Sequence, residues 1–320
     1  MNGFAGLEQD LLAQGLVDTH YHIGPELLPR RYDVKSLAEA AREWNPTVVL
    51  KNHTYATTPL AALARAHFGA RFLGSVVLNR FVGGLNPDAV LGAVSGNRTD
   101  VQGGAGKELP VVVWMPTVHA ESHLRVLGRA FDPRWHSSAA AASDPANDSA
   151  SETPVPVFDG DLRPVRQLSP VLEAIAATGS ILATGHLAAP EIMRLVPMAL
   201  EAGIRRVILT HPHYPSVQLS DDQLRQLASD ERVFIEHCFA IHTIEKVPLE
   251  DIAESIRVTG PEQVVLSTDF GQIRSQPFPE GTLTYAGQLS QLVGDHVGRS
   301  WLVRMFTSNG ARALSVNDGE

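Results

Sequence analysis

The sequence predicts an α/β fold, specifically a (β/α)8 TIM barrel, for the single chain of 320 residues. Short apolar runs of the buried parallel-strand type recur eight times along the chain, and segments with helical patterning separate them. Polar residues suited to chemistry end several of these runs, as expected at the carboxyl ends of barrel strands. An open, doubly wound sheet is the alternative, because strand counting alone does not exclude it.

The eight expected strands are rich in Val, Ile and Leu and cover residues 15–20, 47–51, 72–78, 110–115, 181–186, 206–211, 232–237 and 263–269. Helical segments lie between them at residues 34–44, 58–68, 190–202 and 220–228. Strands that alternate with helices form parallel sheets, and eight such units can close into a barrel.

One segment interrupts this alternation. Residues 136–156 are rich in Ala, Ser, Asp and Pro and lack periodicity, which predicts a flexible surface insertion between the fourth strand and its helix. A lid over the barrel mouth is the alternative. Because no repeat or linker divides the chain, we expect residues 1–320 to form one domain.

Composition narrows the classes of partner. The net charge of −9 disfavours nucleic acid, which requires a basic face. Cys238 is the only cysteine, so no intrachain disulfide can form. Without a leader sequence or an apolar stretch of about 20 residues, we expect a cytoplasmic protein with a small-molecule substrate and no membrane partner. Homo-oligomers are common among such barrels, although no patch in this sequence requires one.

The strongest local motif is the pair His20 and His22 at the end of the first strand. Residues two apart in a strand point to the same side, so both imidazoles can bind one metal ion. A lone His-x-His is weak evidence, because such histidines are usually ordinary core or surface residues. However, His186, His211 and Asp269 end the fifth, sixth and eighth strands, and each is costly to bury unless paired or ligated. Together they predict a metal site at the barrel mouth.

This pattern resembles the amidohydrolase superfamily, whose members carry a His-x-His on strand one, histidines on strands five and six and an aspartate on strand eight. Residues 307–314 are also similar to the Asn-Pro-Ala segment of that superfamily, with Gly310 in place of the proline. The resemblance implies that His20, His22 and Asp269 ligate the more buried metal. It implies that His186 and His211 hold a second metal, or position substrate and water if only one binds.

The chain departs from that pattern on the fourth strand, which ends in Trp114 and Met115 without a bridging lysine or glutamate. Lys51 instead ends the second strand. Because burial favours the neutral amine, which can react with carbon dioxide, a carboxylated Lys51 is our hypothesis for the missing bridge. The alternative is that Lys51 pairs with an acid or contacts a substrate carboxylate.

Weaker candidates surround this set. His53, His213 and His237 are expected to line the pocket or to support the ligands, and Arg274 to receive an anionic substrate group. His123 is expected at a solvated helix start, and Cys238 is expected to be buried.

The predicted function is hydrolysis by metal-activated water of an amide, cyclic amide or imide, or an ester or lactone, with C–N bonds favoured by the resemblance. One or two divalent ions are expected, with zinc first and manganese, cobalt or iron as alternatives. Asp269 would accept the proton of the water, and His211 would polarise the carbonyl. The alternative activities are a single-metal decarboxylase or lyase on the same barrel and a non-catalytic metal-binding barrel. A histidine-rich phosphoesterase fits less well, since it needs more acids and histidines on intermediate strands.

Overall fold

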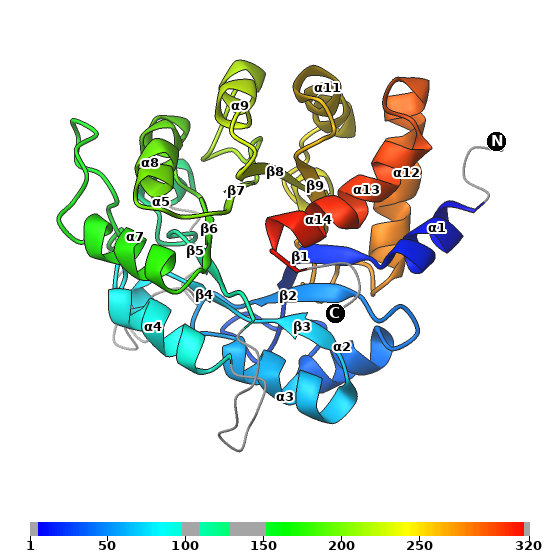
Figure 1. Cartoon of the computed structure of the whole chain (residues 1–320), viewed down its shortest axis with the longest axis horizontal. Helices are drawn as coiled ribbons and strands as arrows, with labels where there is room; N and C mark the ends of the chain where they lie inside the picture. The colour runs from blue at the N-terminus through cyan, green and yellow to red at the C-terminus, as the bar shows by residue number, and fades with distance from the viewer. Residues whose placement is uncertain (1–5, 98–108, 128–151, 317–320) are drawn as a thin grey trace, which may run out of the picture.

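The computed structural model describes residues 6–97, 109–127 and 152–316. Its strands pair in parallel and in chain order, except that β3 and β4 do not pair. They are β1 (Val17–His22), β2 (Thr47–Lys51), β3 (Arg71–Leu73), β4 (Ser75–Val77), β5 (Val112–Trp114), β6 (Ile181–Ala183), β7 (Val207–Thr210), β8 (Val233–Cys238) and β9 (Val264–Ser267). They lie in the middle of the molecule with helices around them (Figure 1). The chain is a (β/α)8 barrel, as the alternation of strands and helices predicted.

Hydrogen bonding divides the strands into two sheets, β1–β3 and β4–β9. At one junction, Asp269 N donates to His20 O at 2.9 Å and His22 N donates to Phe270 O at 2.7 Å. The segment after β9 therefore lies beside β1. This contact joins the first and last strands of the barrel at their carboxyl ends, where the candidate site residues stand.

The other junction corrects the sequence prediction of one continuous third strand at residues 72–78. Gly74 divides it into β3 and β4, because Thr57 inserts beside β4: its N–H donates to Ser75 O at 2.8 Å, and its hydroxyl donates to Leu50 O at 2.6 Å. A Cβ atom on Gly74 would stand 2.3 Å from the Cα of Thr58, so only glycine permits this approach.

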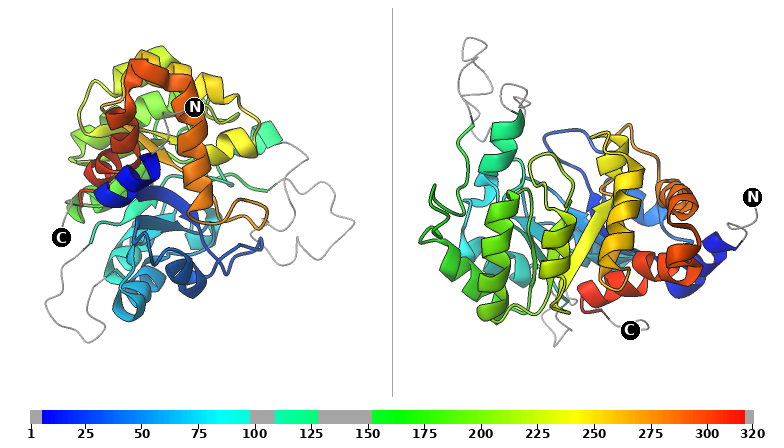
Figure 2. Two further views of the ribbon diagram at one scale, coloured as in Figure 1. Left: turned by 90° about the vertical axis from the view of Figure 1, so that its right-hand side faces the viewer. Right: turned by 90° about the horizontal axis from the view of Figure 1, so that it is seen from above.

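Helices surround the strands in both views of Figure 2. Their bounds are α1 (Leu7–Gln14), α2 (Val34–Ala40), α3 (Thr58–Phe68), α4 (Pro87–Ser95), α5 (Glu121–Leu127), α7 (Leu168–Ala177), α8 (Ala189–Glu201), α9 (Asp221–Leu227), α10 (Phe239–Thr243), α11 (Leu249–Thr259), α12 (Glu280–Val297), α13 (Arg299–Phe306) and α14 (Ser308–Ala313), with a 3-10 turn, η1, at Arg80–Val82. The expected helix at 58–68 is confirmed, whereas α2 ends four residues before the expected residue 44.

Apolar side chains form an outer layer between strands and helices and an inner cluster within the barrel. The inner cluster includes Val17, Trp114 and Phe234 together with Leu314 after α14. A Cβ atom at Gly310 would approach Val17 Cγ1 to 2.7 Å, so α14 packs closely against the start of β1.

The segment similar to Asn-Pro-Ala therefore has a structural position in this chain. Asn309 Nδ2 donates to the carbonyl oxygens of Pro261 and Val264, each at 2.8 Å. These bonds tie α14 to the beginning of β9, at the barrel end opposite the candidate site.

Most of the predicted insertion, residues 136–151, lies outside the described residues. Helix α5 precedes this segment, so the insertion does not separate β5 from the first helix after it. Residues 152–156 are described, and Val155 N donates to His119 O at 2.8 Å, which fastens this end to the barrel.

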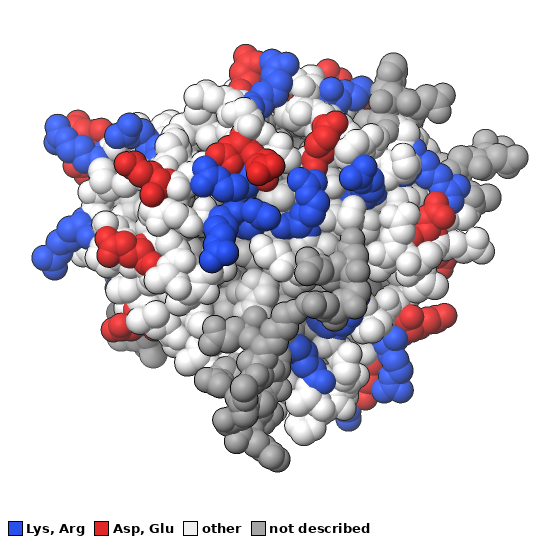
Figure 3. Space-filling model, viewed as in Figure 1, with Lys and Arg blue, Asp and Glu red and all other residues white. Residues whose placement is uncertain are grey.

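Surface charges of both signs lie side by side on the face shown in Figure 3. Among the described residues, Arg232 and Asp230 form an ion pair of 2.7 Å. Among the described helices, none combines the length and apolar character needed to cross a membrane.

Candidate metal centre

An irregularity in β1 prepares its end for the site. The register of β1 against β2 shifts between Asp18 and Tyr21. Such a bulge changes which side chains face each side of the sheet. Thr19 and His20 consequently both reach Glu236 inside the barrel, and Tyr21 packs in the outer apolar layer.

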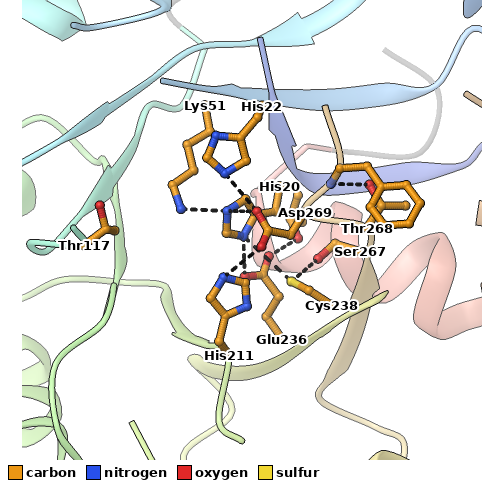
Figure 4. Close-up of polar contacts among 12 residues, drawn as sticks. His20, His22, Lys51, Thr117, His211, Glu236, Cys238, Ser267, Thr268 and Asp269 are labelled. Carbon is orange, nitrogen blue, oxygen red and sulfur yellow. Dashed lines mark hydrogen bonds and ion pairs between the residues drawn. The ribbon is translucent and has the colours of Figure 1, made fainter. Parts of the chain in front are cut away.

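Three histidines converge on Asp269 at the carboxyl ends of the strands (Figure 4). Asp269 Oδ1 lies 3.1 Å from His20 Nε2 and 2.9 Å from His22 Nε2, and Asp269 Oδ2 lies 3.5 Å from His211 Nε2. Ligand atoms of His20, His22 and Asp269 all lie within 4.8 Å of one another. His20 and His22 belong to β1, His211 to the turn after β7, and Asp269 to the turn after β9.

The donor atoms in this cluster fit a divalent cation. Asp269 Oδ1 is buried and accepts no hydrogen bond with acceptable geometry from the described residues, although two imidazole nitrogens stand close to it. Burial alone would raise the pKa of Asp269, but the neighbouring His20 and His211 hold it well below its ordinary value. An ionised carboxylate facing imidazole nitrogens is the donor set that zinc and similar ions prefer.

Glu236 supports this cluster and was missed in the sequence analysis. Its Oε2 lies 3.1 Å from His20 Nδ1, and its Oε1 accepts a hydrogen bond from the Thr19 hydroxyl. Burial would raise the pKa of Glu236, yet the interaction with His20 lowers it to about 2. When His20 donates its Nδ1–H to this carboxylate, the lone pair of Nε2 is available for a metal. The available signal was the alternation in β8, where a glutamate occupies an inward position.

Lys51 lies inside the barrel with 1% of its surface exposed. Its Nζ is 2.7 Å from His20 Nε2 and 5.0 Å from the centre of the Trp114 ring. In the described part of the chain, no carboxylate oxygen approaches Nζ within 4.0 Å, so the predicted alternative of an acid pair is not what the structure contains. Burial lowers the pKa of Lys51, which favours the neutral amine.

His186 occupies a second cluster on the same side of the barrel. Its Nδ1 lies 2.9 Å from His123 Nδ1, and the Tyr214 ring stacks on both imidazoles. His123 is thus buried rather than solvated as expected, because α5 turns its side chain toward the end of β6. Burial lowers the pKa of His123 to about 4 and keeps this imidazole neutral. His53 also lies at the site, with its Nδ1 2.9 Å from the Thr117 hydroxyl.

Two site residues adopt left-handed backbone conformations. The φ angles are 50° at His211 and 52° at Asp269. This region is unfavourable for side-chain-bearing residues, and such strain is found chiefly at functional sites. The sharp turns direct both side chains back over the strand ends.

Other sequence candidates lie elsewhere. His237 alternates with Glu236 along β8, so it faces away from the barrel interior and stacks on His213 with ring centres 5.4 Å apart. A cavity opens over the cluster around Asp269, and neither histidine lines it. Arg274 does not line it either and is exposed on the surface. Strand alternation and the path of the loop place these three residues outside the wall of that cavity, and their contact with substrate stays a prediction.

A cavity of about 290 Å³ opens over the centre. Its wall includes the predicted ligands that reach solvent and several residues from loops and helices: His22, Leu28, Arg30, Lys51, His53, Val118, His123, His186, His211, Tyr214, Ala240, Ile241, Ile244, Glu245, Asp269 and Gln272. The site is therefore accessible to a small molecule.

Comparison with protein families finds a match over residues 15–236 to a model described as "Family of unknown function (DUF6282)". A search of curated proteins finds no significant match. Similar solved structures include an amidohydrolase from Pseudomonas aeruginosa, with a TM-score of 0.51 and 11% identity over 98% of this chain and 99% of that one.

An amidohydrolase from Burkholderia multivorans with bound zinc has a TM-score of 0.52 and 13% identity over 95% and 100% of the two chains. A dihydroorotase has a TM-score of 0.53 and 14% identity over 95% and 70%. These neighbours are members of the amidohydrolase superfamily, and at such identities the likeness concerns the barrel fold.

Proposed function

We propose that this chain, which belongs to the family of unknown function DUF6282, is a metal-dependent hydrolase. Its substrate would be a small molecule in which it cleaves an amide, a cyclic amide or imide, or an ester or lactone. The observation that carries this proposal is the convergence of His20, His22 and Asp269 within 4.8 Å at the open end of the barrel. The chain would act as one domain over residues 1–320.

His20, His22 and Asp269 would hold the first metal, with zinc as the first candidate. A bound divalent ion lowers the pKa of a water ligand to about 7 and polarises a carbonyl oxygen. Asp269 Oδ2, which faces His211 at 3.5 Å, would take the proton of the attacking water and return it to the leaving group. If only one metal binds, His211 Nε2 would donate a hydrogen bond to the carbonyl oxygen as its charge develops.

Lys51 is our candidate for the bridge between two metals. Burial favours the neutral amine over the opposing influence of Asp269 and Glu236, and reaction of this amine with carbon dioxide releases a proton and leaves a carbamate. Its two oxygens would face the first metal at His20 and a second metal held by His186 and His211. For such a site we favour substrates whose C–N bond is hydrolysed, as the resemblance to amidohydrolases implies.

A single-metal decarboxylase or lyase is the second candidate. Trp114 ends β5, and its ring lies 5.3 Å from that of His20. β5 is the fourth strand expected from the sequence, and Trp114 occupies the end of it, where a two-metal site would need a bridging ligand. This favours one metal over two.

The test is the metal content of protein purified without chelator, measured by elemental analysis for the wild type, Lys51→Ala and His237→Ala. The last variant is the matched control, because His237 is a buried histidine outside the cavity. We expect about two equivalents in the wild type and the control and fewer in Lys51→Ala, together with hydrolysis of amide, imide or lactone substrates.

One equivalent in all three proteins would remove Lys51 from the ligand set and favour decarboxylation. Unchanged metal content and activity in His20→Ala would contradict the proposed site altogether. Loss of metal in the His237→Ala control would show that the measurement reports folding rather than ligation.

A further inference from the structure

We propose that Arg30, held by Glu26, is the specificity-determining residue of this site and binds a carboxylate of the substrate. The inference rests on the proposed function, since it names the chemical class of the molecule in the same cavity. The substrate would be a small organic acid with an apolar substituent.

Arg30 is a buried cation at the cavity wall. Its side chain is 4% exposed, and it lines the cavity together with His22, Lys51 and Asp269. Its Nε donates to Glu26 Oε2, and the Glu26 side chain is fully buried. Glu26 is occupied on its other oxygen as well, because Oε1 accepts the backbone N–H of His53.

The terminal nitrogens of Arg30 remain available to a ligand. Within the described residues, Nη1 and Nη2 form no hydrogen bond to the protein, and neither is among the fully buried polar atoms that lack a partner. A guanidinium bound only through Nε leaves its two terminal groups as a planar fork, which matches the two oxygens of a carboxylate.

The backbone around Arg30 fixes the position of this fork. Arg30 bridges to Gln272 in the loop after β9, and Arg31 N donates to Gly271 O at 2.7 Å. Arg31 also donates from its side chain to Ile273 O at 2.6 Å. The same loop carries Asp269, so Arg30 is anchored to the segment that supplies the proton acceptor.

Arg30 also lies at the boundary of two spaces. On one side is the cavity over the metal centre, and on the other an outer groove whose wall includes Pro29, Phe270 and Ile273. Leu28 and Ile244 line both spaces. A substrate with its carboxylate on Arg30 would thus direct its reactive carbonyl toward Asp269 and an apolar group into the groove.

The experiment measures binding of hexanoate and its neutral analogue hexanamide to the metal-loaded protein by isothermal titration calorimetry. The variants are Arg30→Met and, as the matched control, Arg42→Met, which changes an exposed arginine that lines neither the cavity nor the outer groove. We expect Arg30→Met to weaken hexanoate binding about tenfold or more, as for loss of a charge-assisted hydrogen-bonded pair, while metal content, hexanamide binding and the control stay unchanged.

Hexanoate binding by Arg30→Met at wild-type strength, or equal wild-type affinity for hexanoate and hexanamide, would overturn the proposal. If Arg30→Met loses metal or stability, Arg30→Lys decides: it keeps the charge but not the fork, so we expect weaker hexanoate binding at full metal content, and undiminished binding contradicts the assignment. If the wild type holds no metal but binds hexanoate through Arg30, the proposed metal-dependent hydrolase is refuted and the carboxylate site stands. If the metal-loaded protein is a hydrolase but does not prefer hexanoate to hexanamide, the carboxylate site is refuted and the hydrolase stands.

Discussion

Replacing Gly185 with alanine measures how tightly the turn before His186 is constrained, and Gly179→Ala provides a matched control. Both glycines are left-handed, with φ of 61° at Gly185 and 65° at Gly179. A Cβ atom at Gly179 would meet nothing within 4 Å, whereas at Gly185 it would lie 2.4 Å from Met115 O and 2.6 Å from Pro116 O. The two substitutions therefore share the backbone cost and differ in the clash.

The left-handed backbone costs each alanine roughly 1–2 kcal/mol. At Gly185 the clash with two backbone carbonyl groups costs roughly a further 1–3 kcal/mol, because these groups cannot rotate away as a side chain would. We therefore expect Gly185→Ala to lower the free energy of unfolding by about 2–5 kcal/mol and Gly179→Ala by about 1–2 kcal/mol. The clash also displaces the turn in which His186 N donates to Pro116 O at 3.0 Å.

The assay is urea unfolding followed by circular dichroism, with metal content measured on the same samples. Gly185→Ala should unfold at lower urea than Gly179→Ala and should bind less metal at the His186 side of the site. Equal unfolding midpoints for the two variants would refute the reasoning, because only the contact with Met115 and Pro116 distinguishes them.

Three further predictions concern the centre itself. Glu236→Gln removes the carboxylate that orients His20 and should weaken metal binding about 10–100-fold, measured by competition with a chelator; unaltered affinity would exclude this support. In chelator-treated protein, Lys51→Met should match or exceed the wild-type thermal midpoint, because methionine avoids burying an amine without an acid partner, and a large decrease would indicate a stabilising role for Lys51. Gly271→Ala, whose Cβ would lie 2.0 Å from His22 O, should abolish metal binding in elemental analysis, and retained metal would mean that the junction of β1 and β9 tolerates displacement.

Much of the fold and of the central cluster was predictable because both depend on local pattern. Aliphatic runs separated by amphipathic segments predict alternating strands and helices, and parallel strands in a barrel end on one side. His20, His22, His211 and Asp269 could be assigned to one site without coordinates, since each directly ends a strand. The break at Gly74 could not be predicted, because it depends on a threonine hydroxyl from another loop.

The positions of the residues around the central cluster could not be predicted in this way, because they depend on tertiary packing. Glu236 and His237 are neighbours in sequence, but only one can face the interior, and the phase of alternation is set by packing of β8 against β7 and β9. His123 and Arg30 come from a helix and a loop, whose paths depend on contacts distant in the chain. Arg274, expected near an anionic group, is exposed, whereas Arg30 lines the cavity.

The amino-acid sequence alone determined the order of strands and helices and the placement of histidines and an aspartate at strand ends, because periodicity and strand termini are local properties. Only the tertiary structure decided which polar side chains surround that cluster, because Glu236, His123 and Arg30 reach it through strand phase and through loops held by distant backbone hydrogen bonds. The selectivity that we propose for the substrate would depend on this second group of residues, and therefore on the folded arrangement rather than on any local motif.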